Sequence, residues 1–140
     1  MSTELRTIEQ ACEEVRIDLQ TDITSLCWLR QHVLDSDESL SVEQAVERIK
    51  QVLRCLLAED IEIGDSEEDP KKFIIWRGSI DERVEKAHPL IEAYENILRK
   101  SIEVYKENPR KAIDETFEER DYCAFAFWLC YRRNIDEYES

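Results

Sequence analysis

The residues best suited to acid–base or metal chemistry are two histidines and the acids near them. Glu85 and His88 have the three-residue spacing of carboxylate-bridged di-metal bundles, but such sites need a second pair and further glutamates on facing helices. Pro89 also disturbs helical geometry directly after His88. His32 lies on an amphipathic stretch, and the sequence places no nucleophile beside it. We therefore predict a protein that is not an enzyme.

The five cysteines show no zinc-type spacing and no C-x-x-C pair. The N-terminus lacks a basic segment followed by an apolar one, and the longest apolar run, 122–131, is about half of what a bilayer requires. We expect a cytoplasmic protein with free thiols, no metal or cofactor, and no membrane insertion. The cysteines are Cys12, Cys27, Cys55, Cys123 and Cys130.

A run of acids occupies residues 59–69. It does not match a calcium loop because, counted from Asp65, the sixth position is Pro70 and the twelfth is Trp76, where glycine and glutamate are needed. Two interpretations stay open: a solvated acidic loop, or a contact surface for a basic partner. If the second holds, the contacts are Asp65, Glu67, Glu68 and Asp69.

The charge distribution argues against nucleic-acid binding. The net charge is −14, and residues 1–70 carry 18 acids and 6 bases while residues 71–140 carry 15 acids and 13 bases. A nucleic-acid reader needs clustered cations, whereas this N-terminal half would attract a basic protein surface. Solubility alone is the other explanation of the acidity.

The elements that carry these residues are predicted to be mainly helical, because two glycines and three prolines cannot supply the turns of an all-β fold. We predict a single domain, 1–140, of mainly α class: a helical bundle of about five helices with one small two-stranded β-hairpin. The helix at 41–57 followed by this hairpin gives a winged-helix-like middle segment. Its Arg48, Lys50 and Arg54 are offset by acids, so DNA recognition is not expected.

Apolar residues at steps of three and four predict helices over 4–20, 22–34 and 41–57. The first seam, Leu5 to Leu19, could pack in the bundle or form a homodimer. Ser41 and Ser79 precede capping-box partners at Gln44 and Glu82.

Alternation predicts strands at 61–63 and 73–76. The helix after Ser79 is expected to kink or restart at Pro89 and to reach about Tyr105, and Asn108-Pro109 should start the last helix. Alanines and flanking charges favour helix for the run 122–131, with Arg132 and Arg133 at its C-terminal end. A buried strand is the alternative.

One stretch resembles small bacterial proteins of immunity type. Within about residues 45–84, a helix ends in Leu-Leu, a strand leads to Gly64-Asp65, a second strand ends at Trp76, and Gly78-Ser79 opens another helix. This resemblance implies a protein that neutralises a toxin by binding it, and it brings no catalytic residues.

The favoured function is therefore an immunity or antitoxin-type protein that blocks a basic toxin, such as a nuclease, by acidic surface complementarity. The alternative is a structural or regulatory adaptor that acts as a helical homodimer. An enzyme would need scattered carboxylates such as Glu85 and Glu92 to converge.

Overall fold

A computed structural model of the chain describes residues 7–20, 23–34, 40–68 and 71–137. Its elements in chain order are α1 (Ile8–Leu19), β1 (Thr24–Ser25), α2 (Leu26–Leu34), α3 (Val42–Leu57), β2 (Ile61–Glu68), β3 (Lys71–Ile75), α4 (Ile80–Glu107), α5 (Pro109–Ala124), β4 (Trp128–Tyr131) and the 3-10 helix η1 (Arg132–Glu137). The mainly helical class is confirmed, with five α-helices among the described residues. None of these helices is long and apolar enough to span a bilayer.

The helix starts follow from their capping residues. Ser41 accepts from the Gln44 amide and the Gln44 side chain bonds back to Ser41 N–H, and Ser79 and Glu82 do the same, so both predicted capping boxes are confirmed. Thr7 makes a third with Gln10 at the start of α1. Each cap satisfies donors that the first helical turn leaves without partners, which contributes about 1 kcal/mol.

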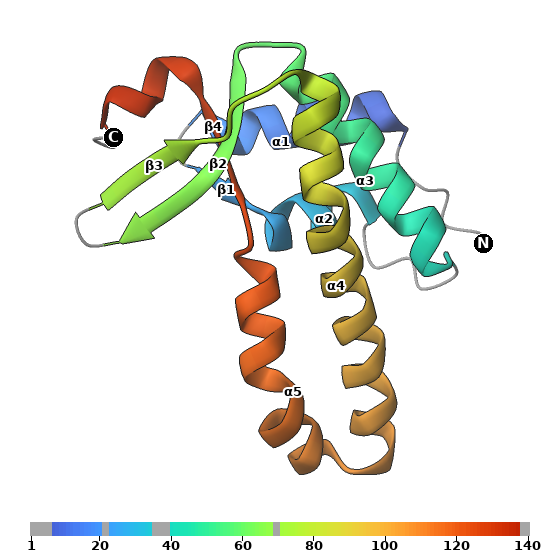
Figure 1. The fold of residues 1–140 in the computed structure, drawn as a ribbon. Coiled ribbons are helices and arrows are strands. Elements are labelled where there is room, and N and C mark those ends of the chain that lie inside the picture. The colour runs from blue at the N-terminus through green and yellow to red at the C-terminus, as the bar shows by residue number, and fades with distance from the viewer. Residues whose placement is uncertain (1–6, 21–22, 35–39, 69–70, 138–140) are drawn as a thin grey trace.

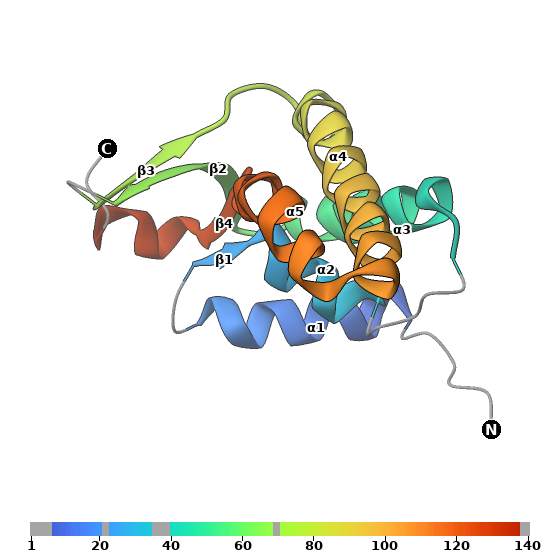
Figure 2. The same ribbon diagram turned by 90° about the horizontal axis from the view of Figure 1, so that it is seen from below.

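The helix α4 is longer than predicted and unbroken. It runs through Pro89 and ends at Glu107, whereas a kink or a restart was expected at Pro89. The Asn108 side chain then accepts from the amides of Arg110 and Lys111, and Pro109 occupies the first position of α5, as predicted. These two helices lie side by side and project from the body of the molecule (Figures 1 and 2).

The predicted hairpin forms, but it belongs to a larger sheet. The four strands lie in the order β1-β4-β2-β3, and all three pairings are antiparallel. An isolated hairpin is marginal in water, so pairing with β4 and packing on both faces explain its stability. The prediction of two strands was thus incomplete.

The helical prediction for 122–131 was wrong in its second half. α5 ends at Ala124, and Trp128–Tyr131 pairs with Ile61–Gly64 as β4. Aromatic side chains favour strands, and the open edge of β2 supplies the ladder. Arg132 and Arg133 consequently do not follow a helix end; Arg132 bonds Glu62, and Arg133 lies over the Tyr131 ring. The helix predicted from 22 likewise begins only at Leu26, because 24–25 form β1.

The sheet has a core on each face. Ile61, Ile63 and Leu129 join the main cluster with the buried faces of α1 to α4. On the opposite face, Phe73 and Cys130 pack with Ile135 of η1 in a smaller cluster. Successive side chains of a strand point to opposite faces, so the strands near β4 are buried on both faces. The far end of the β2–β3 hairpin extends beyond these two clusters.

Candidate partner-binding surface

Three of the four predicted contact residues lie on one strand. Asp65, Glu67 and Glu68 belong to the distal half of β2, where they are paired in the ladder with Ile74, Lys72 and Lys71. Asp69 falls outside the described residues. The predicted acidic loop is therefore strand for most of its length.

This half of β2 forms a two-stranded arm with β3. Residues 61–64 of β2 pair with β4, whereas Asp65–Glu68 pair with β3 alone among the described strands. Figure 1 shows the arm extending from the body on the side away from α3. The arm is defined here as residues 65–68 and 71–74, and its strands pair only with each other among the described strands.

The arm is anchored on one face and exposed on the other. Phe73 is fully buried against Ile135 and Cys130 on the η1 side. Ile74, the next residue, is 43% exposed on the opposite face, directly across from the exposed Asp65. An isoleucine beside a carboxylate suits a partner that is both basic and apolar at the point of contact.

The base of the arm is held by Trp76. Its indole N–H donates to Asp65 Oδ2 at 3.1 Å, and its ring meets Phe127 edge-on with centroids 5.8 Å apart. Lys86 Nζ lies 4.3 Å from the ring centroid, within cation–π range. Gly64 also lies at the base of the arm. The backbone of β3 approaches it so closely that a Cβ there would come within 2.1 Å of the Ile74 carbonyl oxygen. The arm therefore leaves the body in a defined direction.

The acids that precede the arm are neutralised within the chain. Glu59 receives two bonds from Arg16, at 2.7 and 2.8 Å, which raise the pKa of Arg16. Glu62 is nearly buried; Arg83 donates to it at 3.2 Å and Arg132 binds its other oxygen. The acidic run 59–69 thus divides into a paired first part and the arm. Sequence analysis missed these arginines because they lie far from the run along the chain.

The candidate chemical residues have polar partners on neighbouring helices. His32 lies between Asp18 and Glu14, with Nε2 bonded to Asp18. His88 Nδ1 is 3.1 Å from Lys50 Nζ, which also contacts Glu85 at 3.2 Å. Within the described ranges, no group of three or more His, Cys, Asp or Glu could hold a metal ion.

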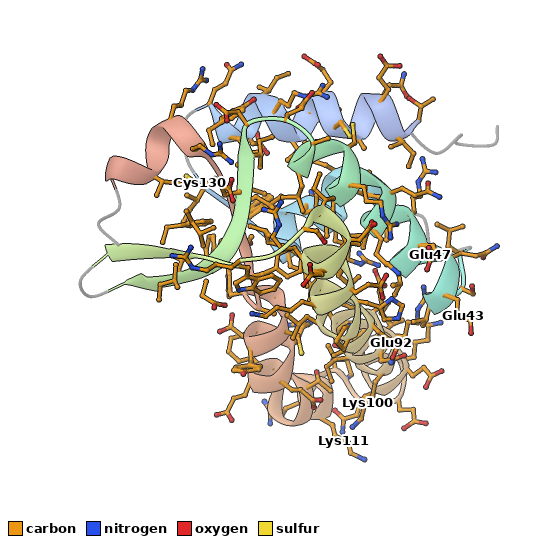
Figure 3. All side chains as sticks on the ribbon, turned by 45° about the horizontal axis from the view of Figure 1, so that its top comes forward. Glu43, Glu47, Glu92, Lys100, Lys111 and Cys130 are labelled. Atoms are coloured by element: carbon orange, nitrogen blue, oxygen red, sulfur yellow. The ribbon has the colours of Figure 1, made fainter. Side chains whose placement is uncertain are left out.

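The glutamates Glu85 and Glu92 contact different side chains. Glu85 also contacts Arg54 at 3.7 Å, and Glu92 lies 3.7 Å from His88. Figure 3 shows Glu92 on α4, and Glu43 and Glu47 projecting from the outer side of α3. Glu85 therefore joins α4 to α3 through Lys50 and Arg54, whereas Glu92 contacts His88 within α4.

The predicted dimer seam is used inside the chain. Cys12, Val15 and Leu19 of α1 are all fully buried in the main core, together with Ala11. Leu5 lies outside the described residues. The described part of this seam therefore packs inside the fold, and the homodimer alternative stays a prediction.

No protein-family model, no curated protein and no solved structure matches this chain. The resemblance to immunity proteins stays a prediction from the motifs between 45 and 84.

Proposed function

We propose that this chain is a cytoplasmic protein-binding module of immunity or antitoxin type, which blocks a basic protein toxin by occluding its surface. The observation that carries the proposal is the arm: Asp65 and Ile74 are exposed opposite one another on an anchored hairpin that extends past the β2–β4 pairing. Steric block and charge complementarity account for such inhibition without any chemistry by this chain.

The cations on α3 favour a protein partner over a nucleic acid. Lys50 is nearly buried and ion-paired with Glu47 and Glu85, and Arg54 pairs with Asp81 across to α4. Two of the three cations on α3, Lys50 and Arg54, are therefore engaged by carboxylates. This pairing favours a protein partner over a nucleic acid.

Capture followed by neutralisation tests the proposal. The immobilised chain is exposed to lysate of the source organism and washed at low and high salt. The expected partner is one basic protein retained in equal stoichiometry and released by salt. Its toxic or nuclease activity should disappear when one equivalent of the chain is added. A captured protein whose activity is unchanged by the chain would contradict the toxin-blocking role.

A further inference from the structure

Two thiols meet where α1 packs on α3. Cys12 on α1 is fully buried, and Cys55 on α3 is half-buried. Cys12 Sγ lies 3.8 Å from the carbonyl oxygen of Val52, one turn before Cys55 on α3, and Arg16, one turn after Cys12 on α1, reaches Cys55 Sγ at 3.9 Å. The two cysteines therefore lie at the same level of the α1–α3 contact although 43 positions separate them in the sequence.

A fixed cation lies beside the more accessible sulfur. Arg16 Nη2 is 3.9 Å from Cys55 Sγ. The guanidinium is held by Glu59 and by Glu13, at 2.9 Å, and these carboxylate side chains are 41% and 65% exposed. Cys55 is itself only half-buried, so this thiol is the one that a small oxidant can reach. Cationic neighbours of this kind are typical of reactive cysteines.

The other cysteines lie in different surroundings. Cys27 interacts with Tyr94 between α2 and α4, and Cys130 packs with Phe73 on the far face of the sheet. Cys123 is buried near the end of α5. All five are free thiols in this structure. The Cys12–Cys55 pair is thus distinguished by both a sulfur neighbour and an adjacent arginine.

We propose that Cys12 and Cys55 form an oxidation site at which a hydroperoxide closes a reversible disulfide between α1 and α3. Cys55 sulfur attacks the peroxide, the O–O bond breaks, and Cys55 sulfenic acid forms with release of an alcohol, or of water if the oxidant is hydrogen peroxide. Cys12 sulfur then attacks the sulfenic sulfur; the S–S bond forms, the S–O bond breaks, and the Cys12 proton leaves with the hydroxyl as water. Two thiols are oxidised and one peroxide is reduced.

The order of attack follows from exposure and position. Cys55 is half-buried and lies beside Arg16, whereas Cys12 is fully buried, and burial raises the pKa of the Cys12 thiol. Cys55 therefore meets the oxidant first, and Cys12 resolves the sulfenic acid.

The test treats the full chain with hydrogen peroxide at neutral pH, followed by blocking of free thiols and peptide mapping by mass spectrometry. The expected product has lost two hydrogen atoms, contains a Cys12–Cys55 peptide link, and regains both thiols on treatment with dithiothreitol. A Cys12→Ser variant should accumulate sulfenic acid at Cys55 that reacts with dimedone. A Cys27→Ser variant is the matched control and should form the bridge normally.

A different cysteine pairing, or both thiols still free after oxidation of other sites, would overturn the proposal. Circular dichroism checks that each serine variant folds; if Cys12→Ser does not, the peptide map of the unchanged chain decides alone. The proposal is independent of partner binding, since it is read on the isolated chain.

Discussion

The indole N–H of Trp76 donates to Asp65 Oδ2 across 3.1 Å, and this bond joins the residue after β3 to the point where β2 leaves the body. Asp65 therefore has two roles. It is an exposed acid on the arm, and it also fixes the base of the arm against a tryptophan that is itself packed on Phe127.

Replacement of Asp65 by alanine should loosen the arm without unfolding the domain. Loss of one hydrogen bond to a charged acceptor predicts a decrease of about 1–2 kcal/mol in the free energy of unfolding, measured in urea. The Trp76 indole proton resonance should also move, whereas those of Trp28 and Trp128 should stay. A Glu103→Ala variant, changed on the exposed surface of α4, is the control. An unmoved Trp76 resonance would show that the bond does not persist in solution.

Gly64 should tolerate no side chain. A Cβ there would meet the Ile74 carbonyl oxygen at 2.1 Å and its carbon at 2.8 Å, so Gly64→Ala must displace β3. We expect a loss of about 2–3 kcal/mol in the free energy of unfolding. Ser66→Ala, two residues along the same strand, should change it by much less. Equal stability of the two variants in thermal melts would contradict the close approach.

The sequence was informative where structure is local. Capping residues and apolar spacing predicted α3, the start of α4 and the start of α5, because these signals depend on neighbours within one or two turns. The strand at 128–131 could not be assigned in this way, since its pairing partner at 61–64 is almost half the chain away.

The same limit applies to the candidate surface. The acids of 59–69 were visible as a group, but the pairing of Glu59 and Glu62 within the chain depends on Arg16, Arg83 and Arg132. None of these follows from spacing. The meeting of Cys12 and Cys55 is hidden for the same reason, because it depends on how α1 packs on α3.

Removal of the Glu62 carboxylate should be costly. Its side chain is only 9% exposed and lies between Arg83, which is 11% exposed, and Arg132. Glu62→Ala leaves the Arg83 charge nearly buried without its partner, which predicts a loss of about 3 kcal/mol in urea unfolding. Arg132→Ala should cost much less because Arg132 is 66% exposed. A larger loss of stability in Arg132→Ala than in Glu62→Ala would show that the Glu62–Arg83 pair is not the buried, stabilising contact.

Alkaline conditions should destabilise the fold. The pKa of Cys12 is raised from 9.0 to about 12, and burial raises that of Tyr94 as well. For each group, the folded chain still holds the proton at pH values between the unfolded and the folded pKa, whereas the unfolded chain has released it. The free energy of unfolding therefore falls as the pH rises through this range. The slope is up to about 1.4 kcal/mol per pH unit for each group. Cys12→Ala should flatten the decline between pH 9 and 12; an identical slope would exclude Cys12 as a source.

The central claim is that the arm binds a basic partner, and a matched pair of charge reversals tests it most directly. Glu67→Lys/Glu68→Lys alters the arm, and Glu103→Lys/Glu107→Lys makes the same change in net charge near the end of α4. Figure 3 labels Lys100 and Lys111 at this end of the α4–α5 hairpin, and Figure 1 shows it to be remote from the arm.

Association with the captured partner is measured by surface plasmon resonance over a range of salt concentrations. We predict that the arm variant associates at least tenfold more slowly and with a flatter salt dependence, while the α4 variant stays within about twofold of the unchanged chain. If both variants associate equally slowly, the effect comes from net charge and not from the arm. Unchanged binding by the arm variant would contradict the assignment of the arm as the binding surface.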